Sequence, residues 1–177
     1  IKPTTRNYLF LTLFCTIIHI TGLPAPAIFG LDRNKLYEVW RPFTAVAYLG
    51  PPSMSMANSL YFLLRYGQTL EEANGAGAHA WFLLVQTVLL TIFGLILSFP
   101  FQAQAMIAAI VYVCSRINAM EKIPIQFGLV ITAWQLPYCM LVLDCLSQQK
   151  IEASWPHILG ILSGHIYHFT TTIWPNL

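Results

Sequence analysis

The side chains best able to do chemistry stand near the end of the chain, where His165 and His168 follow Ser163. A histidine inside an apolar segment can relay a proton or bind a metal, and it usually faces water or neighbouring helices. A zinc site needs more ligands than two histidines, and no Cys, Asp or Glu shares their helical turn. The sequence therefore predicts neither a metal site nor a cofactor, and it favours histidines that form hydrogen bonds between packed helices.

Ser163 is a candidate nucleophile only if a histidine can take its proton. It stands two positions before His165, and side chains at that spacing point to different faces of a helix. The two residues are therefore poorly placed for nucleophilic catalysis.

Gly160 and Gly164 form a pair of small residues four positions apart on the same segment. Glycines at this spacing let two helices approach closely in a membrane, where van der Waals contact drives helix association. We expect this face to pack against another helix, which is the ordinary use of such a pair.

Trp40 and Arg41 stand in a stretch, 30–50, that mixes charged and aromatic residues. This stretch is too polar to span a membrane and too apolar for an ordinary loop. Trp rings and long basic side chains are stable in the membrane interface, where Arg can extend its guanidinium to lipid phosphates. The sequence predicts an interfacial segment anchored by Trp40 and Arg41.

The composition indicates that these segments lie in a membrane. Of the 177 residues, 56% are hydrophobic and 9% are charged, whereas a soluble domain carries roughly 25% charged residues. The nine Lys and Arg are scattered and the net charge is only +2, which excludes a nucleic-acid surface. We therefore predict a membrane protein whose first partner is the lipid bilayer.

Apolar runs that suit a bilayer crossing occur six times along the chain. The predicted spans are 8–23, 53–64 (extending at most to 70), 80–97, 101–113, 127–146 with a kink at Pro137, and 156–174. Spans two and four are short, and lipid accommodates a short span by thinning. The expected fold is all-α, a polytopic membrane protein with one transmembrane domain over 1–177. The Lys and Arg count favours cytosolic termini by one residue.

Six spans with a large first loop resemble the rhomboid class of intramembrane serine proteases. These enzymes need an activated serine in a G-x-S-G setting on span four and a histidine on span six. Span four here is FQAQAMIAAIVYVCSR, whose one serine, Ser115, stands at the polar end beside Arg116. His165 therefore has no serine to activate, and we predict a pseudoprotease rather than an enzyme.

Five motifs, in order along the chain, resemble those of the derlins, the rhomboid-like pseudoproteases of endoplasmic-reticulum-associated degradation. The motifs are VWRPFTAVAYLG at 39–50, RYGQTLEE at 65–72, YVCSR at 112–116, LPYCMLVLD at 136–144 and GILSGHIYHF at 160–169. The resemblance implies a six-span rhomboid-like helical bundle. It places the family's Trp-Arg and Gly-x-x-x-Gly signatures on Trp40, Arg41, Gly160 and Gly164.

The resemblance also implies a function. Derlins help to move misfolded proteins out of the endoplasmic reticulum, with a membrane ubiquitin ligase complex and a cytosolic AAA ATPase, by thinning the bilayer and offering a lateral opening. The expected location is the endoplasmic reticulum membrane. Ser55, Asn58, Ser59 and His165 are candidates to line a hydrated cavity at such an opening.

The sequence departs from the family at three places. Cys114 stands where many derlins have Trp, basic residues do not follow the Leu-Glu pair at 70–71, and the tail that recruits the ATPase is not found within 1–177. Three hypotheses stay open. The first is retrotranslocation, or protein import by a derlin-like subunit in a plastid or mitochondrial membrane. The others are an active intramembrane protease that uses Ser163 and a subunit that only scaffolds a larger complex.

Overall fold

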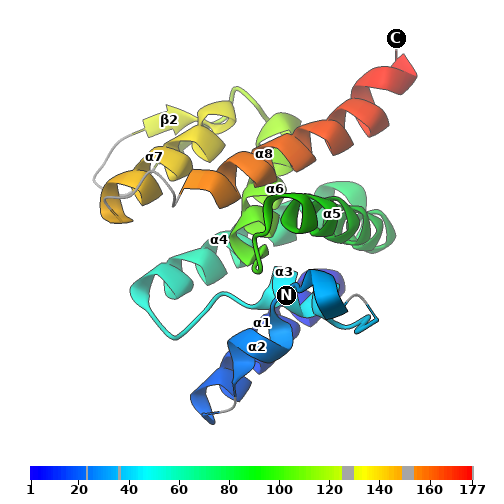
Figure 1. Cartoon of the computed structure of the whole chain (residues 1–177). Coiled ribbons are helices and arrows are strands. Elements are labelled where there is room, and N and C mark those ends of the chain that lie inside the picture. Colours follow the sequence, from blue (N-terminus) through cyan, green and yellow to red (C-terminus); the bar gives the residue numbers. More distant parts are fainter. Residues whose placement is uncertain (23, 36, 125–129, 149–153, 177) are drawn as a thin grey trace.

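Helices make up most of the computed structural model, which describes residues 1–177 except 23, 36, 125–129, 149–153 and 177 (Figure 1). The long helices are α1 (Pro3–Ile20), α4 (Met54–Asn74), α5 (Ala76–Leu97), α6 (Ala103–Ile117), α7 (Leu136–Gln148) and α8 (Trp155–His168). The shorter elements are α2 (Ala25–Phe29), η1 (Arg33–Lys35), α3 (Arg41–Ala47), β1 (Lys122–Pro124), β2 (Val130–Thr132), η3 (Ala133–Gln135), η5 (Phe169–Ile173) and η6 (Trp174–Asn176). The predicted helical class is confirmed, apart from one small hairpin.

The central helix of the bundle is α6, whose side chains are nearly all buried. It is rich in alanine, and the small side chains of Ala105, Ala108 and Ala109 let α8 lie directly against it. On another side α6 packs against α4, which contributes Leu63 to the same core. The side chains of α4 and α8 are therefore positioned by the contacts of these two helices with α6.

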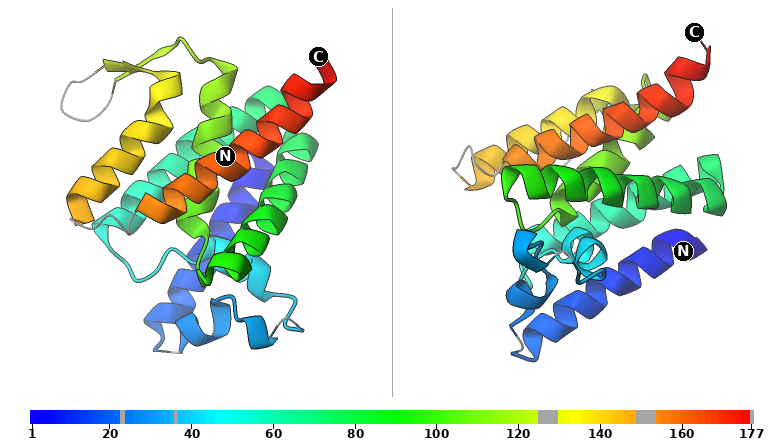
Figure 2. Two further views of the ribbon diagram at one scale, coloured as in Figure 1. Left: turned by 45° about the horizontal axis from the view of Figure 1, so that its top comes forward. Right: turned by 45° about the vertical axis from the view of Figure 1, so that its right-hand side comes forward.

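Successive long helices run in opposite directions through the bundle. The start of α1 meets the end of α4, where Thr4 donates its backbone N–H to the Glu71 carboxylate. The start of α5 meets the end of α8, where the Phe82 and Tyr167 rings pack edge to face. We call this the terminus end, since both chain ends lie there in the right-hand view of Figure 2. The opposite end, which carries α2 and α3, is the loop end.

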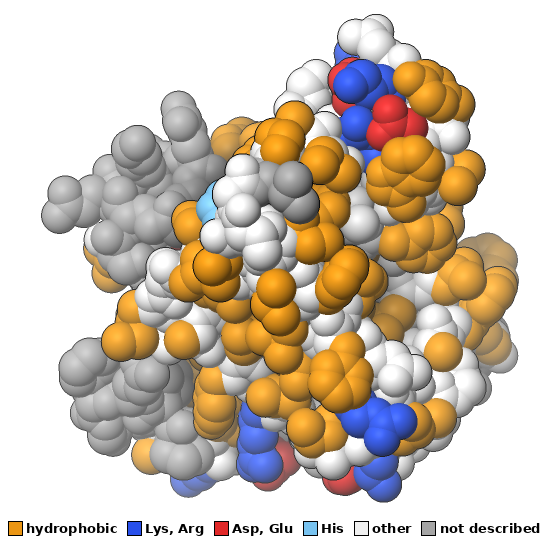
Figure 3. All heavy atoms as spheres, turned by 90° about the horizontal axis from the view of Figure 1, so that it is seen from below, with side chains coloured by type: hydrophobic (Ala, Val, Ile, Leu, Met, Phe, Trp, Pro, Cys, Tyr) orange, Lys and Arg blue, Asp and Glu red, His pale blue; other side chains and the backbone are white. Residues whose placement is uncertain are grey.

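The surface of the bundle has the pattern expected of a protein in a bilayer. In Figure 3 apolar side chains cover the middle of one face, and charged side chains gather at opposite edges. Among the described residues one helix, α5, is both long and apolar enough to cross a membrane by length and composition. Two shorter apolar helices cover Ala103–Ile117 and Ala133–Leu146.

The second predicted span is longer than its apolar run. Helix α4 starts after Ser53, whose hydroxyl accepts a hydrogen bond from the Met56 N–H, and it continues to Asn74. The helix therefore extends past the predicted span, and its last turns are too polar for α4 to count among the helices apolar enough to cross a membrane. The polar last turns stay helical because one of their faces, with Gly67 and Leu70, is buried against other helices.

The fifth predicted span also differs from the structure. Its start at position 127 lies outside the described residues, and its next part is strand β2, which pairs antiparallel with β1 just before the predicted span. Pro137 does not kink the helix but begins it, as the second residue of α7. Proline fits the first turn of a helix, where the missing N–H would have no partner. The apolar run predicted a helix there but not the break before it.

Candidate functional site

A cluster of polar side chains joins α6, α7 and α8 at the terminus end. The Tyr112 hydroxyl lies 2.8 Å from His165 Nδ1, and the two rings meet edge to face. The Arg116 guanidinium carbon lies 4.7 Å from the centre of the Tyr112 ring. Its Nη2 lies 3.4 Å from the hydroxyl of Tyr138, in the first turn of α7. His168, one turn beyond His165 on α8, is half-buried.

The two glycines of α8 produce this arrangement. A Cβ atom at Gly160 would overlap the Ala105 carbonyl oxygen, and one at Gly164 would lie 3.1 Å from the Tyr112 ring. Only glycine permits α8 to lie this close to α6 without displacing the backbone. Gly160 and Gly164 thus set how closely α8 approaches α6, and so bring His165 against α6.

The serines nearest this cluster are not presented to His165. Ser163 is 0% exposed, and its hydroxyl donates to the Gly160 carbonyl oxygen at 3.0 Å. The Ser115 hydroxyl donates to the Tyr112 carbonyl oxygen at 2.6 Å. On α6 it is the Tyr112 phenol that meets the histidine.

The buried side chain of Arg41 forms hydrogen bonds that connect parts of the first loop. This side chain is 5% exposed, and its Nε donates to the Glu38 carboxylate at 2.7 Å. Its Nη1 donates to the carbonyl oxygens of Ala27 and Gly30, at 3.0 and 2.6 Å. The Nε and Nη1 donors of Arg41 are therefore used inside the loop, and the predicted contact of its guanidinium with lipid phosphates stays a prediction. Trp40, beside it, is 48% exposed.

Known proteins are similar to this chain over nearly its whole length. The model of the Der1-like family matches residues 1–177. Derlin-1 of Arabidopsis thaliana is 30% identical over 99% of this chain and 68% of its own length. Derlin-1.1 of Zea mays is 30% identical, covering 99% and 74%, and Derlin-1 of Mus musculus 28%, covering 99% and 72%. The chain belongs to the derlin family. Derlins are membrane proteins and inactive relatives of the rhomboid proteases.

The four residues expected to line a hydrated cavity do not come together in this derlin chain. Ser59 is buried at the loop end, where it accepts a hydrogen bond from Gln104 Nε2 at 3.0 Å. Ser55 and Asn58 are exposed on α4. His165 contacts Tyr112, and Gln104 and Tyr112 stand eight positions apart on α6, a rise of about 12 Å. Ser59 and His165 therefore have different partners in the bundle, and a hydrated cavity shared by the four residues stays a prediction.

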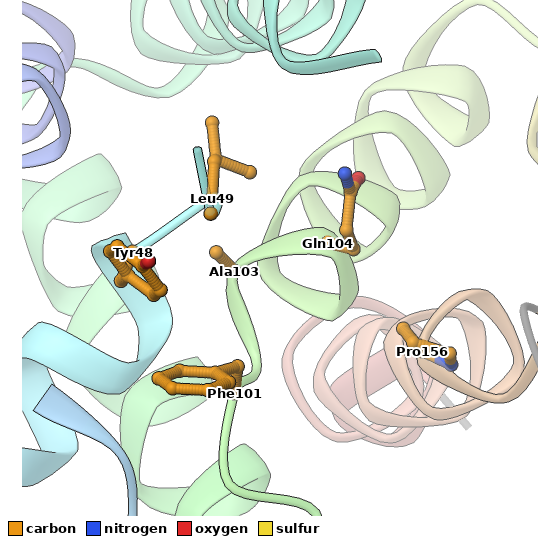
Figure 4. Close-up of a pocket in the computed structure, with 7 residues that line it drawn as sticks. Tyr48, Leu49, Phe101, Ala103, Gln104 and Pro156 are labelled. Atoms are coloured by element: carbon orange, nitrogen blue, oxygen red, sulfur yellow. The ribbon is translucent and has the colours of Figure 1, made fainter. Parts of the chain in front are cut away.

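A different cavity, of about 210 Å³, opens at the loop end of this derlin chain. Figure 4 shows Tyr48 and Phe101 on one side of it and Pro156, from α8, on the other. The Tyr48 and Phe101 ring centres are 5.0 Å apart, and the Tyr48 hydroxyl lies 2.9 Å from His19 Nδ1. Its lining is mostly apolar.

Sequence reasoning missed three members of the terminus-end cluster and one of the loop. Tyr112, Arg116 and Tyr138 all lie in motifs that carried the resemblance, but no role was expected for them. Tyr112 and Arg116 stand four positions apart, the spacing at which helical side chains meet, and this was the available signal. Glu38 could have been found in the same way, three positions before Arg41.

Proposed function

We propose that this chain is a non-catalytic derlin that assists retrotranslocation of misfolded proteins across the endoplasmic reticulum membrane. It crosses the membrane six times with cytosolic termini, and it acts with a membrane ubiquitin ligase complex and a cytosolic AAA ATPase. Family membership supports this proposal. So does the pairing of His165 with Tyr112, because a phenol stands on α6 where a protease would present its serine to the histidine.

The observation that carries the mechanism is the short apolar helix at the edge of the bundle. The apolar run Ala133–Leu146 has a helical length of about 21 Å, whereas a bilayer core is about 30 Å thick. Val142, Leu143 and Leu146 are exposed on it and face the lipid. Helix α6 is equally short but central, so lipid does not contact most of it. The mismatch therefore acts on lipid beside α7.

Lipid beside a short span thins until its apolar thickness matches the protein. A thinner core lowers the free energy needed to move a polar polypeptide across it, because fewer backbone groups are without water at once. We therefore place the lateral opening beside α7, where a misfolded chain would enter.

The thinning can be measured on the full chain in lipid nanodiscs by cryo-electron microscopy. We expect the bilayer to be thinner beside α7 than beside α5, whose 22 residues suffice to cross the membrane. This comparison has an internal control, because both helices lie in one disc. A bilayer of equal thickness beside the two helices would contradict the mechanism.

Export itself can be tested in cells that lack their own derlins, by following the half-life of a misfolded luminal reporter. Trp40→Ala removes a ring that is exposed at the loop end, so it should prolong the half-life without unfolding the bundle. Phe10→Ala is the matched control, since Phe10 is exposed on α1, outside the first loop. Rapid export by the Trp40→Ala protein at equal expression would count against an anchoring role.

A further inference from the structure

Arg116 is an arginine with few partners. Its Nε is fully shielded from solvent and has no hydrogen-bond partner, and its Nη2 makes only the 3.4 Å contact with Tyr138. Among the described residues it forms no ion pair. Glu121, in the turn after α6, does not reach it. A guanidinium has five N–H donors, and within the described part of the chain the one hydrogen-bond acceptor of Arg116 is the Tyr138 hydroxyl.

Two other arginines of the same chain donate to more acceptors than Arg116 does. Arg41 uses its donors on Glu38 and two carbonyl oxygens. Arg33 donates from Nε to the Leu95 carbonyl oxygen at 2.6 Å and from Nη2 to that of Ile96 at 2.9 Å. Each of these two arginines thereby pairs carbonyl oxygens at the end of a helix, α2 for Arg41 and α5 for Arg33. Among the residues that the structure describes, no carbonyl oxygen or carboxylate accepts from Arg116 in this way.

The neighbours of Arg116 are hydrogen-bond donors as well. The Tyr138 hydroxyl touches it directly, and the exposed His165 imidazole is joined to the same Tyr112 ring over which Arg116 lies. A planar guanidinium beside hydroxyl and imidazole groups matches the oxygens of a phosphate, which accept two parallel hydrogen bonds from Arg. We propose that Arg116 and Tyr138, with His165 beside them, bind the phosphate of an acidic phospholipid. This site is independent of the retrotranslocation proposal.

The surroundings favour a lipid over a soluble phosphate. Ile117 and Met120 are 43% and 81% exposed beside Arg116, and both are apolar. Trp134, 38% exposed, lies close by, since its backbone N–H donates to the Ala119 carbonyl oxygen at 3.2 Å. Trp is enriched at the depth of the lipid headgroups. Acyl chains can therefore cover these side chains while the phosphate meets Arg116.

Binding can be measured on the full chain in neutral detergent micelles by native mass spectrometry. The probes are phosphatidic acid, phosphatidylcholine and inorganic phosphate. We expect Arg116→Gln to weaken phosphatidic acid binding about tenfold, since a bidentate charge-assisted pair is lost. Arg65→Gln is the matched control because it removes an exposed arginine from the same end. It should leave the affinity within about twofold.

Two milder variants keep the test decisive if Arg116→Gln does not fold. Arg116→Lys keeps the charge but loses the planar fork, and Tyr138→Phe loses only a hydroxyl, so each should weaken binding by a smaller factor. Equal affinities for the wild type and all three variants would overturn the site. So would equal losses in Arg65→Gln, or equal binding of phosphatidylcholine. If inorganic phosphate displaces phosphatidic acid at equal concentration, the ligand is a soluble anion and the lipid assignment fails.

Discussion

The two ends of the bundle use arginine in opposite ways. At the loop end Arg41 is buried, and its Nε and Nη1 donate to Glu38 and to carbonyl oxygens of the preceding turns. At the terminus end Arg116 stacks on Tyr112, and its one hydrogen-bond acceptor among the described residues is the Tyr138 hydroxyl. The first residue is a structural element of the loop, and the second is open to a ligand.

The difference shows that residue type and charge do not decide the role of a membrane arginine. The acceptors within reach decide it, because burial of an unpaired guanidinium is costly and burial of a paired one is tolerated. A segment that anchors itself to lipid through arginine must leave the donors free. In the first loop Nε and Nη1 of Arg41 are already paired, and the exposed aromatic side chains Trp40 and Phe43 are better placed for the predicted anchoring.

Substitution of Arg41, the arginine at the loop end, should have the largest effect on the free energy of unfolding. Arg41→Gln leaves the Glu38 carboxylate, whose side chain is 14% exposed, without its partner. Removal of one member of a buried pair costs about 3–5 kcal/mol of unfolding free energy. The loss can be measured by denaturant titration in micelles. The Glu38→Gln, Arg41→Gln double variant should recover part of it, and no recovery would show that the carbonyl contacts dominate.

The terminus end has its own buried charge, on Glu71. Its carboxylate accepts hydrogen bonds from the Thr4 and Thr5 N–H groups and the Thr5 hydroxyl, at 2.9, 2.8 and 2.7 Å, and so caps α1. Burial would raise the pKa of Glu71, but the hydrogen bonds from Thr5 and Thr4 outweigh burial and lower it. A lowered pKa means that the folded state favours the ionised carboxylate.

Glu71→Gln should therefore destabilise the chain less than Arg41→Gln, by about 1–3 kcal/mol, since the amide keeps one acceptor oxygen. The pH dependence has a definite sign. The contribution of Glu71 is present above its usual pKa, near 4.5, and is lost as the pH falls through the lowered folded value. Unfolding curves across that acidic range should show a smaller loss in Glu71→Gln than in the wild type. Parallel curves would mean that Glu71 is not ionised in the fold.

Much of the helical fold could be predicted from the sequence, because apolar runs are local. Helix α5 begins only four residues before the predicted 80 and ends at the predicted 97. The end of α4 could not be predicted in this way. Its polar residues counted against a membrane span, yet Glu71 is satisfied by α1, which is distant in sequence. The hairpin before α7 was missed for a similar reason, since its apolar strand was grouped with the helix that follows.

The candidate site could be predicted where it depends on the spacing of residues along one helix. It could not be predicted where it depends on how two helices are placed against each other. Gly160 and Gly164 share a face because they stand four residues apart, whatever they pack against. Whether His165 meets Ser59 or Tyr112 is decided by the position of α8 along α6. That position is fixed by contacts with Ala105 and Ala108, which the sequence does not pair with α8.

The smallest effect on stability is expected at Arg116. Substitution of Arg116 leaves no carboxylate unpaired. The variant loses one cation–π contact with Tyr112, worth about 0.5–1 kcal/mol at an exposed site. Denaturant titration of Arg116→Gln without acidic lipid should therefore give nearly the wild-type curve. Added phosphatidic acid should then stabilise the wild type and not the variant, because a ligand that binds only the folded state raises its stability. A loss as large as that of Arg41→Gln in lipid-free micelles would place Arg116 among the structural arginines and remove the contrast between the two ends.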